Sequence, residues 1–286
     1  MDTKESKICF VSGIVAGIST ALICAPLDTA RTRFQIQGLY TEKNYSSIFQ
    51  ALSKIYQKEG FKSLYQGTSI SVLAYPTSWS FYFYFYERAK VNLSETIHSK
   101  FMNNLLSASF AGVISAVIAN PLWLIRVRMQ SQYPKVCSPF GIFKGIVEKE
   151  GFFSLYKGTS SSILSVIHVA VYFPLYEYIK ERVILDESPT ILGIIISSWI
   201  PKVIASLFSY PFELLRARLY INDKNIETRF KGFTGLIKFT YMAEGIRGFY
   251  GGFFANLLRI LPSTFVTFYT YEKIKAIGKD HHWFNK

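Results

Sequence analysis

Pro26-Leu-Asp28-Thr-Ala-Arg31-Thr-Arg33, an octapeptide near the start of the chain, has two further versions downstream. The second is Pro121-Leu-Trp123-Leu-Ile-Arg126-Val-Arg128, and the third is Pro211-Phe-Glu213-Leu-Leu-Arg216-Ala-Arg218. Each version places a proline ahead of two arginines, and two versions also carry a carboxylate two residues after the proline. Recurrence at a spacing of about 95 residues is typical of a chain built from repeated structural units.

Two other motifs follow every copy of the octapeptide, in the same order. A Glu-Gly pair precedes a Tyr-x-Gly, as in Glu59-Gly60 and Tyr65-x-Gly67, and each block ends in Tyr-Glu-x-x-Lys. The other copies are Glu150-Gly151 with Tyr156-x-Gly158, Glu244-Gly245 with Tyr250-x-Gly252, and closing motifs that begin at Tyr86, Tyr176 and Tyr271. The sequence therefore predicts three repeats, over residues 1–98, 99–187 and 188–286.

Each repeat contains two apolar stretches that approach the ~20 residues a membrane-spanning helix needs. They occupy residues 8–25 and 69–86, 105–120 and 160–176, and 190–210 and 254–271. A polar stretch with a short helical pattern, such as residues 46–56, separates the two. We predict an all-α membrane protein with six transmembrane helices and a short surface helix in each repeat. A soluble α-solenoid is the alternative, but it needs polar terminal repeats, and none is visible in the sequence.

The composition fits helices with one lipid face and one polar face. The 286 residues are 50% hydrophobic, yet the mean hydropathy is only +0.20. The 32 Lys and Arg against 19 Asp and Glu give a net charge of +13, which indicates an anionic partner. The cations are spread through every repeat and not gathered on one face, so we expect anionic lipid and an anionic solute as partners, and no nucleic acid.

The sequence contains no pattern of an enzyme or a metal site. The three cysteines lack metal-ligand spacing, and no Gly-rich phosphate loop, HExxH or nucleophile elbow is present. We therefore expect no catalytic residue, no metal and no cofactor.

The three repeated motifs resemble those of the mitochondrial carrier family over essentially the whole chain. The resemblance implies a barrel of six tilted transmembrane helices with pseudo-threefold symmetry around a water-filled cavity. It also implies solute exchange by alternating access. We expect a monomeric, multi-pass protein of the mitochondrial inner membrane, with a plastid or a mitochondrion-derived organelle as the open alternative.

The resemblance also assigns the charges of the octapeptides to a matrix gate. An ionisable group inside a membrane is costly unless it is paired or faces water. The implied pairs are Asp28 with Arg126 and Glu213 with Arg31, placed just beyond prolines that kink their helices. Those prolines are Pro26, Pro121 and Pro211.

The matrix gate departs from threefold symmetry at Trp123, which stands where the other repeats have a carboxylate. Arg216 consequently lacks an acidic partner, and we expect Trp123 to hold it by a cation–π contact. Gln35 and Gln130 lie one turn beyond Arg31 and Arg126. The resemblance implies that both brace the ion pairs.

The Tyr-Glu-x-x-Lys motifs are implied to form a cytoplasmic gate at the other end of the barrel. The implied pairs are Glu87 with Lys180, Glu177 with Lys275 and Glu272 with Lys90. The alternative is that these are surface charges which interact within their own helices, three residues apart.

Solutes are not threefold symmetric, so we expect specificity where the repeats differ. Arg259 corresponds to Ala74 and Leu164 in the other repeats, and Lys202 corresponds to two glycines. Two cations without an obvious acidic partner predict a site for an anion, and arginine suits phosphate or carboxylate. The further candidates for solute binding are His168, Trp79 and Trp199.

Several segments narrow the resemblance to carriers of NAD, pyrimidine nucleotides, FAD and folate. These segments are Trp123 in its octapeptide, residues 78–86, residues 168–177 and residues 201–206, and residues 168–177 look most like the NAD members. The resemblance implies exchange of a nucleotide or nucleotide-type cofactor, with NAD+ or a pyrimidine nucleotide first. FAD or folate, a small carboxylate, and a proton leak or structural role remain open.

Overall fold

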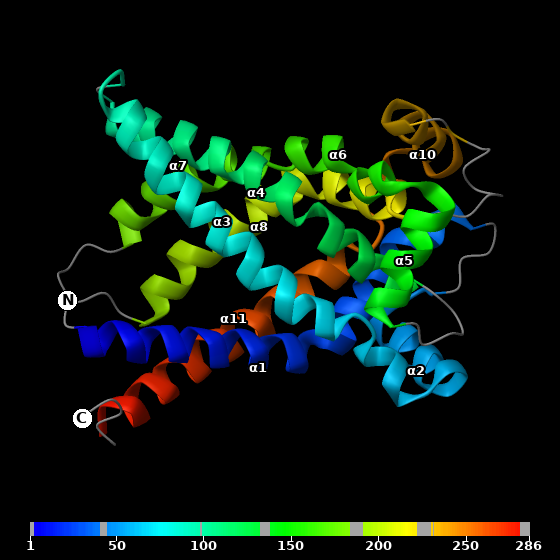
Figure 1. The fold of residues 1–286 in the computed structure, drawn as a ribbon, viewed down its shortest axis with the longest axis horizontal. Helices are drawn as coiled ribbons and strands as arrows, with labels where there is room; N and C mark the ends of the chain where they lie inside the picture. Colours follow the sequence, from blue (N-terminus) through cyan, green and yellow to red (C-terminus); the bar gives the residue numbers. More distant parts are fainter. Residues whose placement is uncertain are drawn as a thin grey trace.

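The structure, a computed structural model, describes residues 3–40, 45–97, 99–131, 138–183, 191–221, 230 and 232–280. Within these ranges every regular element is a helix, and six long helical segments follow one another along the chain (Figure 1). They are α1 (Thr3–Ile36), α3 (Thr68–Ser94), α4 (Lys100–Ser131), α6 and α7 together (Thr159–Leu164 and Ile167–Val183), α8 (Ile191–Leu219) and α11 (Phe253–Asp280). The predicted all-α class is confirmed.

The long helices close into a ring because each repeat packs on the next. The most extensive contacts join α3 to α4, α7 to α8, and α11 back to α1. The last helix therefore lies beside the first, and both chain termini lie at one end of the barrel (Figure 1). This arrangement is a six-helix barrel with pseudo-threefold symmetry. We call the end that carries the termini the terminal end.

Short helices gather at the opposite end, which we call the short-helix end (Figure 1). They are α2 (Ile48–Glu59), α5 (Pro139–Glu150) and α10 (Gly232–Gly248). Ser47 and Ser138 cap the first two, since each side chain accepts a hydrogen bond from a backbone N–H of the first turn. Two 3-10 turns, η2 (Phe61–Tyr65) and η3 (Phe152–Tyr156), lead from these helices to α3 and α6.

The Tyr-x-Gly motifs have a structural explanation. Gly67, Gly158 and Gly252 immediately precede α3, α6 and α11, each with a φ of 78–80°. Only glycine adopts this left-handed conformation without strain. A Cβ atom on Gly158 would also lie 2.8 Å from the Tyr220 ring, and one on Gly252 would lie 2.8 Å from Phe34 Cβ. The motif thus starts the second long helix of each repeat, which is α3, α6 or α11, tightly against a neighbouring repeat.

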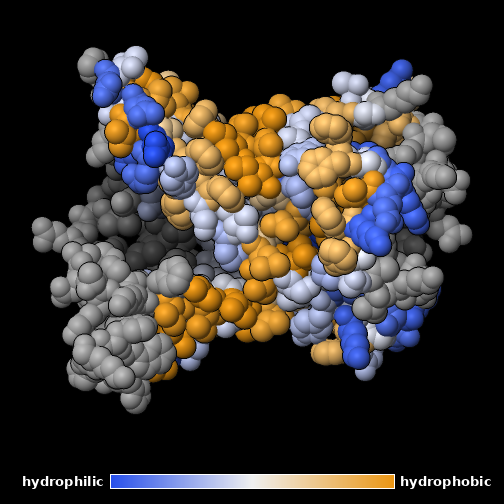
Figure 2. All heavy atoms as spheres, in the orientation of Figure 1, coloured by the Kyte–Doolittle hydropathy of each residue, from blue (hydrophilic) through white to orange (hydrophobic). Residues whose placement is uncertain are grey.

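The surface suits a bilayer. Figure 2 shows apolar side chains over the middle of the molecule and hydrophilic ones at the short-helix end. By length and composition, three described segments are apolar enough to span a membrane: Val11–Leu39, Phe101–Ser131 and Phe152–Ile179. The α3 helix is as long as these, but its many tyrosines and serines lower its hydropathy.

Two features differ from the predicted helices. The helices α1, α4 and α8 run on through Pro26, Pro121 and Pro211, so the octapeptides are helical. The stretch 160–176 is not one helix, because α6 ends at Leu164 and α7 begins at Ile167. The connection is tightened by i→i−3 bonds from the N–H groups of Val166 and His168, and Ser165 Oγ donates back to Ser161 O. Such back-bonding by serine weakens regular helix.

Candidate functional site

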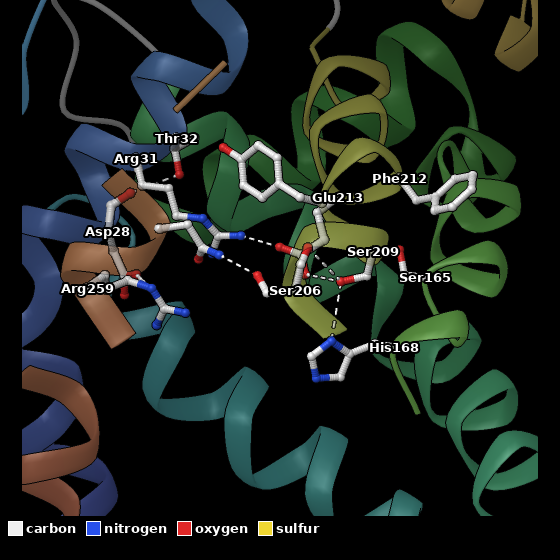
Figure 3. Close-up of polar contacts among 12 residues, drawn as sticks. Asp28, Arg31, Thr32, Ser165, His168, Ser206, Ser209, Phe212, Glu213 and Arg259 are labelled. Atoms are coloured by element: carbon white, nitrogen blue, oxygen red, sulfur yellow. Dashed lines mark hydrogen bonds and ion pairs between the residues drawn. The ribbon is translucent and has the colours of Figure 1, made fainter. Parts of the chain in front are cut away.

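Two ion pairs join three of the long helices near the short-helix end. Arg126 Nη2 of α4 lies 2.9 Å from Asp28 Oδ2 of α1, and both side chains are less than a tenth exposed. Arg31 of α1 forms an ion pair with Glu213 of α8, whose side chain points toward it in Figure 3. At the same level of α8, the Ser161 hydroxyl of α6 donates a hydrogen bond of 2.6 Å to the Phe212 carbonyl, which ties α6 to α8.

Arg259 also has an acidic partner, contrary to the sequence analysis. Its Nε lies 3.3 Å from Asp28 Oδ1 (Figure 3). Because Asp28 also pairs with Arg126, its carboxylate is shared between the two arginines. The contact exists because α11 packs on α1 where the ring closes. Lys202 of α8 is half-buried, close enough to Arg259 for the two cations to interact electrostatically, and has no ion pair with any described residue.

Trp123 does not hold Arg216, and that expectation was wrong. The guanidinium over the Trp123 ring belongs to Arg126, at 5.1 Å. The indole Nε1 donates to Ser78 Oγ at 3.1 Å, and the ring packs edge-on against Tyr75 at 5.1 Å. Trp123 therefore packs against Arg126, three residues later on the same helix, instead of reaching across the ring of helices.

His168 is connected to the Arg31–Glu213 ion pair through one serine. Its Nδ1 lies 3.3 Å from Ser209 Oγ, which lies 3.5 Å from Glu213 Oε1 (Figure 3). The imidazole ring also stacks on Tyr172, with ring planes 8° apart, and Tyr172 stacks on Tyr176. One face of α7 thus carries an aromatic column that ends at the ion pairs.

The two other candidate tryptophans have no described contact with the cations. Trp79 is 55% exposed and packs on Phe83 and Tyr82 within α3. Trp199 is half-buried on α8. On the third wall, α11 carries small hydroxyl groups on the face of Arg259, at Ser263 and Thr267.

The two glutamines lie beside the ion pairs, but neither side chain is hydrogen-bonded to them among the described residues. Gln130 Oε1 accepts a hydrogen bond of 2.7 Å from the Thr32 hydroxyl, which links α4 to α1. Gln35 is buried, and its Nε2 has no hydrogen-bond partner among the described residues.

The second arginine of each octapeptide forms a ring of contacts that the sequence analysis missed. Each pairs with the glutamate of the Glu-Gly motif in its own repeat, and its Nε donates to a backbone carbonyl in the next repeat. The three sets are Arg33 with Glu59 and Gln130 O, Arg128 with Glu150 and Tyr220 O, and Arg218 with Glu244 and Gln35 O. The second arginine of the octapeptide and the glutamate of the Glu-Gly motif both recur in all three repeats, and this recurrence is the sequence signal from which the contacts could have been predicted.

The terminal end carries the proposed cytoplasmic pairs, and the one pair that can be assessed is not formed. Glu272 and Lys90 make no ion pair with each other, and Lys90 Nζ instead lies 5.5 Å from the Tyr86 ring centroid. The side chains of Lys180 and Lys275 lie outside the described residues, and Glu87 and Glu177 are exposed. Figure 2 shows the molecule hollowed at this end.

Comparison with known proteins identifies the family. The family model "Mitochondrial carrier protein" matches three times, over residues 3–96, 98–187 and 187–282. The chain is 35% identical to "Nicotinamide adenine dinucleotide transporter 1, chloroplastic" of Arabidopsis thaliana, over 94% of this chain and 91% of that protein. It is 34% identical to "Mitochondrial nicotinamide adenine dinucleotide transporter 1" of Saccharomyces cerevisiae, over 94% and 76%. "Folate transporter 1, chloroplastic" of Arabidopsis thaliana is 33% identical, over 94% and 95%. A threefold motif, a closed six-helix ring and these matches together place the chain in the mitochondrial carrier family.

Proposed function

We propose that this carrier exchanges a nucleotide or nucleotide-type cofactor, NAD+ or a pyrimidine nucleotide first, across the mitochondrial inner membrane, with a plastid as the alternative location. The observation that carries the proposal is the pair of cations, Arg259 and Lys202, which interact electrostatically with each other, beside the His168–Tyr172 column. The relatives named above include NAD and folate transporters, which supports a solute of this kind.

The recognition we propose divides the solute between two walls. Phosphate oxygens would bind Arg259, whose planar guanidinium can donate two parallel hydrogen bonds, and Lys202. A base or nicotinamide ring would stack beside His168 and Tyr172, since aromatic faces stack at the spacing these rings already adopt. A small carboxylate would use Arg259 but would leave the aromatic column without a role.

The gating we propose follows from the shared carboxylate. The ion pairs Asp28–Arg126 and Arg31–Glu213 would close the matrix side, and the Tyr-Glu-x-x-Lys charges would close the cytoplasmic side in the alternate state. Breaking a desolvated pair costs about 3–5 kcal/mol. An anion that binds Arg259 competes with Asp28 for that guanidinium, so binding offsets part of the cost of opening. Opening without a solute is then rare, which favours exchange over leak.

A thermal-shift screen of the purified carrier in detergent tests the solute. The panel is NAD+, CTP, UTP, FAD, tetrahydrofolate and malate. At equal concentrations, the solute that binds most tightly stabilises the folded state most. We expect the largest rise in melting temperature from NAD+ or a pyrimidine nucleotide, and exchange of the same solute in liposomes. If FAD or tetrahydrofolate gives the largest rise, the protein is an FAD or folate carrier, which is the second candidate function. Stabilisation by malate alone would contradict the nucleotide proposal.

Arg259→Gln tests the site within the same experiment. We expect this variant to lose the ligand-induced rise in melting temperature, and its exchange rate to fall about tenfold or more. This is the factor that corresponds to a hydrogen bond with a charged group. Arg88→Gln is the matched control, because Arg88 is exposed on α3 and stacks only on Tyr84 among the described residues. Equal loss in both variants would remove Arg259 from the site.

A further inference from the structure

Arg216 is the third member of a set of which the other two are ion-paired. It occupies the position of Arg31 and Arg126 in the third octapeptide, on the helix that also carries Glu213. Arg31 and Arg126 each bind a carboxylate of another repeat. Arg216 forms no ion pair and no side-chain hydrogen bond with any residue that the structure describes, although it is partly buried.

The residue that replaces the missing carboxylate cannot satisfy Arg216, because its own contacts are directed elsewhere. The Trp123 ring lies under Arg126, and its N–H donates to Ser78. Arg126 is thereby surrounded by Trp123, Tyr75 and Asp28. On the other side, Glu213 is within electrostatic reach of Arg216, but its ion pair is with Arg31.

The arrangement leaves the ion-paired end of the barrel positively charged. Four cations stand against two carboxylates among the described residues around the ion pairs, which leaves two positive charges uncompensated. The cations are Arg31, Arg126, Arg216 and Arg259, and the carboxylates are Asp28 and Glu213. A partly buried guanidinium without a counter-ion is costly, so an anion that reaches it binds favourably.

We infer that Arg216 is a ligand-binding residue, which takes a phosphoryl group of the carried solute and is available to it because Trp123 replaces a carboxylate. The inference rests on the proposed function. It assigns the two phosphoryl groups of a pyrophosphate to different cations, one to Arg259 with Lys202 and the other to Arg216. Arg216 lies three residues after Glu213 on α8, and Glu213 is joined to Arg31, which lies three residues after the Asp28 that contacts Arg259. The fork of arginine suits a phosphoryl oxygen pair.

The test compares solutes that differ by phosphoryl groups. Binding of NAD+ and CTP is measured by thermal shift and titration in detergent, each beside its monophosphate, nicotinamide mononucleotide or CMP. Arg216→Gln is expected to raise the half-saturating concentration of the pyrophosphate-containing solute about tenfold or more. The monophosphate is expected to change less, because Arg259 still binds its single phosphoryl group. A residue with only a structural role would weaken both solutes alike.

A second set of variants keeps the inference testable if Arg216→Gln folds poorly. Trp123→Glu restores the carboxylate found in the other repeats and is expected to bind Arg216, so it should weaken the pyrophosphate-containing solute as Arg216→Gln does. Trp123→Gln is the control, since it removes the indole without adding a charge. In an Arg216→Gln background, Trp123→Glu and Trp123→Gln should bind the solute equally.

The outcomes separate this inference from the proposed function. Wild-type affinity in Arg216→Gln, together with lost affinity in Arg259→Gln, overturns the role of Arg216 and leaves the nucleotide carrier intact. Equal effects of Trp123→Glu and Trp123→Gln on a chain that retains Arg216 overturn it as well. A wild-type protein stabilised by neither NAD+ nor CTP overturns the preferred solutes, and the inference with them.

Discussion

Asp28 has a different electrostatic environment from Glu213, although both occupy the same place in their octapeptides. Asp28 binds Arg126 and Arg259 through its two oxygens, whereas Glu213 binds Arg31 and lies near Ser209. The two carboxylates therefore respond differently when their charge is exchanged with that of a partner. This difference distinguishes the two ion pairs experimentally.

Exchanging charges should rescue one pair better than the other. Each single reversal, Arg31→Glu or Glu213→Arg, is expected to lower exchange about tenfold or more, because it leaves like charges in contact. The double variant should recover most of the loss. The double variant Asp28→Arg with Arg126→Asp should recover less, because Asp28 is within ion-pair distance of Arg259 as well, whereas Glu213 is within that distance only of Arg31 among the described residues. Exchange in liposomes and melting temperatures measure the recovery in each double variant. Equal recovery of the two double variants would contradict the sharing of Asp28 between two arginines.

The sequence predicts contacts at the residue scale where the repeats agree and fails where they differ. Asp28–Arg126 and Arg31–Glu213 are the pairs that the family resemblance of the repeated motifs implies, and the structure contains both contacts. The Arg259–Asp28 contact does not, because its equivalents in the other repeats are apolar. The direction of the Trp123 ring depends on the rotamer that Tyr75 and Ser78 permit, which no motif encodes.

At the scale of elements, the structure contains the predicted helices in the predicted order. The contacts that join one repeat to the next were not evident from the sequence. In this ring of contacts, the second arginine of each octapeptide pairs with a glutamate and so joins a short helix to α1, α4 or α8. The Nε of the same arginine joins that long helix to the next repeat. The break between α6 and α7 also could not be predicted, since it depends on local i→i−3 bonding and serine contacts that apolarity does not reveal.

Removing one glutamate of this ring should destabilise the barrel. Glu59→Ala leaves Arg33 buried without its carboxylate, whose side chain is 5% exposed, and is expected to cost about 3–5 kcal/mol. The control is Glu148→Ala, because the Glu148–Lys144 pair on α5 is well exposed and should be worth less than about 1 kcal/mol. Thermal unfolding in detergent compares them. Similar melting temperatures for the two variants would show that the ring does not hold α2 to α1.

The whole molecule is ion-paired at the short-helix end, and Figure 2 shows it hollowed at the terminal end. Alternating access requires the reverse state to close the terminal end, and Glu272 with Lys90 is the proposed pair there whose side chains are both described. Because this pair is not formed here, we expect it to contribute in the reverse state. A substitution of Glu272 is therefore expected to change the equilibrium between the described state and the reverse state, and not the stability of the described state.

Glu272→Gln separates these two effects. The melting temperature without solute should change little, within the ~0.5 kcal/mol typical of an exposed substitution, since Glu272 is exposed and not paired with Lys90. Exchange in liposomes should fall about fivefold or more, the factor for an ion pair worth about 1 kcal/mol. Asp28→Asn is the contrasting variant, because it breaks contacts that this state contains and should lower the melting temperature. If Glu272→Gln lowers the melting temperature as much as Asp28→Asn, Glu272 stabilises the present state and the alternating roles of the two ends are wrong.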